Sequence, residues 1–253
     1  MDQSDATAEE IHQALRELNI INRWLGGEQI STSGIARLLN GYHRPYRIID
    51  FGCGGGGTLQ AIHRWSRDRQ IEVELTGLDI RPEAIRHSER VLGHMHNLEL
   101  LQGDFRRFQP EDNAYDIAHC SLFMHHFYEE DLYHLIEKMY RSASLGIIIN
   151  DLHRHGLAER CIRLLTRLFS NSRLVKNDAP LSVRKGFLRP ELEAIFDKLH
   201  LTDYTIQWRW AFRYLVVVNK NSKLQNSNAV NDPHNREPHP AVIPLENDSD
   251  DQA

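Results

Sequence analysis

The sequence predicts an α/β protein built on a doubly wound parallel sheet. A short apolar stretch at 47–52 runs into the glycine-rich segment Asp50-Phe-Gly-Cys-Gly-Gly-Gly-Gly57. Three more apolar stretches follow in order, near 73–79, 98–103 and 115–121, and polar residues stand at the end of each. Segments with helical spacing of apolar residues separate them, as expected when crossover helices join parallel strands.

The first strand is expected at 47–52, and the turn after it indicates a nucleotide-like ligand. Asp50, Gly52, Gly54 and Gly56 fit the pattern D-x-G-x-G-x-G. Glycine is favoured where φ is positive or where a ligand approaches bare backbone, and such turns hold cofactors in doubly wound folds. No Lys-Ser or Lys-Thr pair closes the loop, so a phosphate-binding P-loop is excluded. Because a G-x-G-x-x-G spacing also fits from Gly52 to Gly57, a dinucleotide remains an alternative.

Acids follow the next two strands. Asp79 ends the strand at 73–79, and a carboxylate in that position accepts hydrogen bonds from a ribose diol. Asp104 follows the strand at 98–103 and precedes Phe105. The strand at 115–121 runs into a polar cluster that begins at His119.

The ordered set of motifs resembles one family. Asp50-x-Gly-x-Gly-x-Gly56, Leu-Asp79, Gly103-Asp104 and Tyr115-Asp116 look like the class I S-adenosylmethionine-dependent methyltransferases of the small-molecule type. The resemblance is close over residues 45–152. It implies a Rossmann-like sheet of seven strands with the last strand antiparallel, and S-adenosylmethionine as the cofactor.

The resemblance also implies a role for each cofactor-site residue. Asp50 would orient the loop and the methionine amine, while the turn would approach the methionine and ribose. Asp79 would bind the ribose hydroxyls, with Ile80 against the adenine, and Asp104 would accept from the adenine amino group. The full set implied is Asp50, Gly52, Cys53, Gly54, Gly56, Asp79, Ile80, Asp104, Phe105 and His119.

The remaining segments complete one domain over residues 1–220. Residues 8–40 are expected to form an N-terminal helical cap, with Gly26-Gly27 ending the first helix and Ser31 leading a second one. A β-branched run at 145–150 suits a buried parallel strand. An amphipathic helix at 156–170 has the position of a lid inserted over the substrate in this family, within 153–186.

The last part of the domain predicts a core helix and a pair of strands. The helix begins near 187, and strands at 204–210 and 213–219 are joined by so short a link that they should be antiparallel. The polar composition of 221–253 predicts a disordered tail.

Three histidines are candidate catalytic bases: His125, His126 and His153. Histidine changes its protonation near neutral pH and so suits removal of a hydroxyl proton, although each could instead have only a structural role. No metal is expected, because the three cysteines form no C-x-x-C pair and the acid and amide ligands of metal-dependent relatives are not evident.

The expected activity is methyl transfer to a small molecule, with O-methylation of an aromatic or polyketide-like natural product preferred. The apolar residues of 156–170 favour a covered, apolar acceptor pocket. Carbon methylation of a quinone-type ring, a non-catalytic cofactor-binding scaffold and an NAD-dependent oxidoreductase are the alternatives. A nucleic-acid partner is disfavoured, because the net charge is −5 and no Asn/Asp-Pro-Pro-aromatic stretch follows the fourth strand.

Composition sets expectations for the location of the protein. No apolar run reaches the roughly 18 residues of a membrane span, and no N-terminal apolar signal is present. A cytoplasmic enzyme of secondary metabolism is therefore expected, with a small-molecule acceptor as its partner and a homodimer as one option for its assembly.

Overall fold

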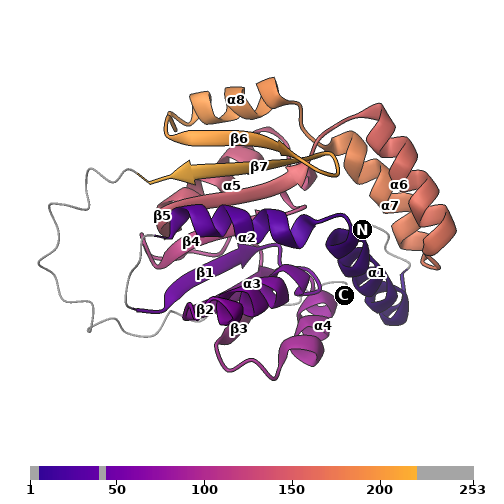
Figure 1. Cartoon of the computed structure of the whole chain (residues 1–253), viewed down its shortest axis with the longest axis horizontal. Helices are drawn as coiled ribbons and strands as arrows, with labels where there is room; N and C mark the ends of the chain where they lie inside the picture. Colours follow the sequence, from indigo (N-terminus) through magenta and orange to yellow (C-terminus); the bar gives the residue numbers. More distant parts are fainter. Residues whose placement is uncertain (1–5, 40–43, 221–253) are drawn as a thin grey trace, which may run out of the picture.

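The computed structural model describes residues 6–39 and 44–220. A seven-stranded sheet lies between two layers of helices (Figure 1). The strand order is β3-β2-β1-β4-β5-β7-β6. The strands are β1 (Tyr46–Phe51), β2 (Val73–Asp79), β3 (Leu98–Gln102), β4 (Tyr115–Ser121), β5 (Ala143–Leu152), β6 (Tyr204–Arg209) and β7 (Arg213–Asn219).

The sheet has the predicted topology. Strands β1 to β5 are parallel to one another, whereas β7 is antiparallel to both β5 and β6. The order reverses between β1 and β4, and ligands of open α/β sheets bind at the carboxyl ends of the strands at such a switch point. Asp50 lies there, in register with Gly77 of β2 and His119 of β4.

Side chains alternate between two apolar layers because successive strand residues point to opposite faces. Ile48 packs in one layer with α2 (Gly27–Leu38), α3 (Gly57–Asp68) and α4 (Pro82–Leu92). Ile49 packs in the other with α5 (Glu129–Ser142) and α8 (Arg189–Lys198).

Two local expectations are wrong. Helix α2 begins at Gly27, since Gly26 turns the chain with φ of 77°, and Ser31 therefore lies inside the helix rather than leading it. No helix links β3 to β4 either: residues 103–114 form turns. This link carries the chain past β2 and β1 to the start of β4, and its length is close to the dozen residues that a parallel crossover needs.

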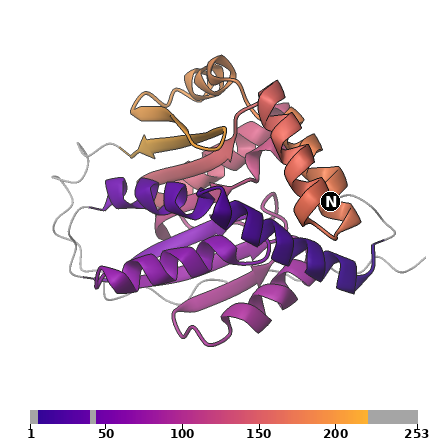
Figure 2. The same ribbon diagram turned by 45° about the vertical axis from the view of Figure 1, so that its right-hand side comes forward.

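Three helices form a cap beyond the carboxyl ends of the parallel strands (Figures 1 and 2). They are α1 (Ala8–Trp24), the expected α6 (Gly156–Phe169) and α7 (Arg173–Lys185), which the sequence did not predict and which contains Pro180. Helix α7 packs on α6, on α1 and on the short helix η1 (Met124–His126) after β4.

The apolar side chains of α6 differ from their expected role in an acceptor pocket. Leu157, Leu164, Leu168 and Phe169 are exposed.

Among the described residues, no helix is long and apolar enough to cross a membrane. The tail expected at 221–253 lies outside the described residues.

Candidate active site

The glycine turn after β1 has the backbone that its sequence requires. Gly52, Gly54 and Gly56 have φ of 72°, 53° and 73°, in the left-handed region that side chains disfavour. A Cβ on Gly52 would lie 2.1 Å from the ring of Phe123, whereas one on Gly54 would meet nothing within 4 Å. The turn is therefore closed at Gly52 and open in front of Gly54.

Asp79 holds the open part of this turn in place. Its Oδ2 accepts a hydrogen bond from the backbone N–H of Gly54 at 2.8 Å, and its Oδ1 accepts one from the N–H of Arg81 at 2.9 Å. Burial raises the pKa of Asp79, and these two bonds only partly offset that effect. Because each carboxylate oxygen can accept more than one bond, both retain capacity for a diol.

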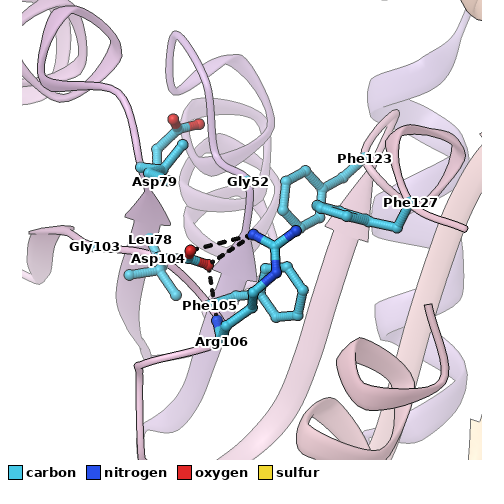
Figure 3. Close-up of a pocket in the computed structure, with 10 residues that line it drawn as sticks. Gly52, Leu78, Asp79, Gly103, Asp104, Phe105, Arg106, Phe123 and Phe127 are labelled. Atoms are coloured by element: carbon cyan, nitrogen blue, oxygen red, sulfur yellow. Dashed lines mark hydrogen bonds and ion pairs between the residues drawn. The ribbon is translucent and has the colours of Figure 1, made fainter. Parts of the chain in front are cut away.

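A hollow of about 60 Å³ lies beside the turn (Figure 3). Three phenylalanine rings form its apolar wall: Phe105 and Phe127 have centroids 4.8 Å apart, and Phe123 and Phe127 also 4.8 Å apart, both edge-to-face. Ile80, at the rim, is 46% exposed. The structure thus gathers five predicted cofactor residues around one hollow: Gly52, Asp79, Ile80, Asp104 and Phe105.

Arg106 is a lining residue that the sequence analysis missed. Its guanidinium carbon lies 5.1 Å from the Phe105 ring centroid (Figure 3), and it binds Asp104 at 3.2 Å and Asp131 at 2.7 Å. The hydrogen bond to Asp131 is the largest of the effects that raise the pKa of Arg106. Its position directly after Asp104 and Phe105 was the only available signal.

Asp50 and His119 form a buried polar chain under the turn. His119 Nδ1 lies 2.7 Å from Asp50 Oδ1, and its Nε2 lies 2.9 Å from the hydroxyl of Ser31. That hydroxyl also accepts from the amide of Asn150 at 2.9 Å. Since both ring nitrogens of His119 are engaged and the ring is fully buried, it supports Asp50 from below.

Cys53 lies buried in the same turn. Its sulfur would be 3.0 Å from a Cβ added to Gly77 of β2. Burial raises the pKa of this thiol well above its usual range, so it remains protonated and fills space beside the turn.

The three candidate bases lie in different environments. His125 is buried, and its Nδ1 lies 2.7 Å from Oδ1 of Asp151, at the carboxyl end of β5. Its Nε2 is buried and has no hydrogen-bond partner among the described residues. Neighbouring His126 is exposed. His153 is occupied elsewhere, because its Nδ1 lies 3.2 Å from the indole N–H of Trp208.

Asp151 completes the buried pair with His125. Burial opposes its ionisation, but the charge of His125 and hydrogen bonds from His125 and the Leu152 backbone outweigh burial and lower the pKa of Asp151. When His125 is neutral, donation from its Nδ1–H to Asp151 leaves the lone pair on Nε2. No group of three or more potential metal ligands occurs within 6–39 and 44–220.

Comparison with known proteins agrees with this geometry. Residues 48–146 match a family model described as a methyltransferase domain. This segment contains Asp50, the glycine turn, Asp79, Asp104 and His125.

Solved structures share the fold. A SAM-dependent methyltransferase from Aquifex aeolicus aligns with a TM-score of 0.60 and 13% identity, over 85% of this chain and 99% of that one. The plantazolicin methyltransferase BpumL, solved with SAH, aligns with a TM-score of 0.62 and 16% identity, over 85% of this chain and 96% of that one. Human N-acetylserotonin methyltransferase, solved with SAM, aligns with a TM-score of 0.60 and 15% identity, over 85% of this chain and 57% of that one.

Proposed function

We propose that this chain, a class I S-adenosylmethionine-dependent methyltransferase, methylates a hydroxyl group of a small aromatic or polyketide-like molecule. The family match, the shared fold and the glycine turn support the cofactor. The hydroxyl acceptor rests on one observation, the buried His125–Asp151 pair with its unpartnered Nε2.

The cofactor fits the residues present. The open space before Gly54 admits a ligand against bare backbone, and Asp79 beside it retains acceptor capacity for the ribose hydroxyls. Ile80 and Phe105 would contact the adenine across the hollow, with Asp104 at its edge. When bound, the cofactor supplies an electrophilic methyl group on a sulfonium sulfur.

Most of the protein's contribution to such a transfer is positioning and exclusion of water. A hydroxyl acceptor must also lose its proton as its oxygen bonds to the methyl carbon and the carbon–sulfur bond breaks. His125 can take that proton on Nε2, and Asp151 stabilises the resulting imidazolium across 2.7 Å. A neutral amine already has a nucleophilic lone pair and depends on a base much less than a hydroxyl does, so the pair favours a hydroxyl.

Access to His125 is controlled by the cap. Helix α7 packs on η1, which carries His125, so the acceptor would enter between the cap and the carboxyl ends of β4 and β5. The same cap would keep water from the methyl group.

The cofactor is tested first, by parallel calorimetric titrations with S-adenosylmethionine, S-adenosylhomocysteine and NAD. Binding of the two sulfur ligands and not of NAD is expected. The acceptor is then sought in a panel of phenols, quinols and amines with labelled S-adenosylmethionine, and NMR of the product locates the new methyl group.

The base is tested with His125→Gln, with His126→Gln as the matched control. Removing a general base lowers kcat by roughly 10²–10⁴-fold, whereas cofactor affinity should be unchanged and the control close to wild type. A methyl group found on ring carbon would reject the O-methyl proposal in favour of carbon methylation. An unaltered kcat in His125→Gln would reject the assignment of the base.

A further inference from the structure

One face of α6 is apolar although no part of the described chain covers it. Leu157, Leu164 and Leu168 are 52%, 59% and 64% exposed, and Cys161 between them is also exposed. Their spacings of four, three and four residues place them on one side of the helix. These four residues are called the α6 stripe below. Soluble surfaces seldom leave such a continuous apolar row uncovered.

The stripe is bordered by positive charge. Arg160 and Arg167 are seven residues apart and so share one flank of the helix, and neither has an ion-pair partner among the described residues. The only acid of α6, Glu159, binds Arg163 at 2.6 Å and Arg184 at 2.7 Å. No acid of α6 is therefore left to pair with the two flanking arginines, and an external anion could bind them.

The segment that contains α6 and α7 is also positively charged. Residues 153–186 contain eight Lys or Arg and two Asp or Glu, a net charge of +6, although the full chain carries −5. Arg154 and Arg173 pair with Glu191 and Glu10 outside the segment, and the positive charge that remains favours an anionic surface at this face.

Exposed tryptophans continue the surface past the start of α6. His155, the N-cap of α6, stacks on Phe212 at 5.0 Å, and Phe212 lies edge-on to Trp208 at 6.0 Å. Trp208 and Trp210 are 50% and 69% exposed. Tryptophan is the side chain most typical of the boundary between lipid and water.

We propose that the α6 stripe, its flanking arginines and the exposed Trp208 and Trp210 bind the surface of an anionic lipid bilayer. Helix α6 would lie in the interface, with its leucines among the acyl chains and Arg160 and Arg167 at the lipid phosphates. It would not cross the bilayer, because 14 residues span only about 21 Å.

A second copy of the chain fits this face less well. In an antiparallel two-fold pair of α6 helices, the flank with Arg160 and Arg167 would meet the same flank of the copy. The arginines of the two copies would then repel each other, and α6 has no unpaired acid that could lie between them. Anionic headgroups supply the missing charge.

The test is sedimentation of the full chain with vesicles of phosphatidylcholine alone and of phosphatidylcholine mixed in equal parts with phosphatidylglycerol. Binding is expected for the anionic vesicles only and should weaken as ionic strength rises. Leu168→Glu should reduce partition roughly tenfold or more. The paired change Arg160→Gln with Arg167→Gln should reduce it by roughly fivefold for each arginine.

Val91→Glu is the matched control, because Val91 is an exposed apolar residue on α4, outside the cap. It should bind vesicles as wild type does, and unchanged thermal midpoints verify that all variants fold. Two results would overturn the proposal: absence of binding to anionic vesicles, or binding that Leu168→Glu leaves intact. A dimer in light scattering that Leu168→Glu dissociates, without vesicle binding, would assign the stripe to a second copy instead.

Discussion

Gly54→Ala separates the two roles that a glycine in this turn can have. The substitution adds one methyl group at φ of 53°, where no atom lies within 4 Å. The backbone N–H that donates to Asp79 is retained. The fold therefore meets only the strain of a left-handed alanine, about 1–2 kcal/mol. For a chain of this size that strain lowers the thermal midpoint by about 2–8 °C.

The effect on the cofactor should be larger, since the added methyl group occupies the space where the cofactor would contact the backbone. Loss of one or two charge-assisted contacts costs about 1.5–3 kcal/mol, which weakens S-adenosylhomocysteine binding by roughly ten- to a hundredfold. Titration calorimetry measures this loss and thermal denaturation measures the strain.

Gly52→Ala is the comparison for this experiment. Its Cβ would lie 2.1 Å from Phe123, so a steric cost of about 1–3 kcal/mol adds to the strain and stability should fall further. If Gly54→Ala binds S-adenosylhomocysteine as tightly as the wild type, the space in front of Gly54 does not hold the cofactor, and the reasoning from the open turn fails.

Three more outcomes concern single polar side chains. Asp79→Ala should bind S-adenosylmethionine much more weakly and still unfold cooperatively, and unchanged affinity by calorimetry would remove it from the site. Ser31→Ala should lower the unfolding free energy by about 1–3 kcal/mol in urea titrations, because it leaves His119 Nε2 unpaired; no loss would show that another group replaces the hydroxyl. Burial opposes ionisation of Asp116, but hydrogen bonds from the Arg44 side chain and the Arg47 backbone N–H outweigh it and lower the pKa of Asp116. The ionised carboxylate therefore stabilises the fold fully above its unfolded pKa of about 3.9. This stabilisation is lost as pH falls through the lower pKa of the folded state. Asp116→Asn should flatten the acid limb of the stability curve, and an identical limb in both proteins would assign acid unfolding to other groups.

The sheet could be predicted from the sequence because its strands have distinctive local patterns. The run from Leu145 to Ile149 contains no polar side chain, as suits a strand covered on both faces. Helix α7 has no comparable pattern: Pro180 interrupts it, and it is stabilised by packing on α1, α6 and η1 rather than by propensity. The start of α2 was misplaced for a related reason, since glycine ends helices more often than it begins them.

The residues of the proposed cofactor site could be chosen from the sequence, whereas the proposed base could not be distinguished from its neighbour. Acids at strand ends meet at one edge of a parallel sheet, so Asp79 and Asp104 could be placed from order alone. His125 and His126 are adjacent and chemically identical in the sequence, and only the fold reveals that one faces Asp151 and the other faces solvent. Arg106 was missed because its role depends on Asp131, which is 25 residues away.

The buried chain from Asp50 to Asn150 joins the glycine turn to the start of α2. His119 is hydrogen-bonded to both Asp50 and Ser31 of α2. Asn150 of β5 donates to Ser31 and to the carbonyl of Gly27. Each of these groups is buried, so a shift of α2 would leave polar atoms unpaired at a cost of about 1–3 kcal/mol each. The start of α2 is therefore held against the strand ends, and the proposed entry of an acceptor beneath α7 would not require α2 to move.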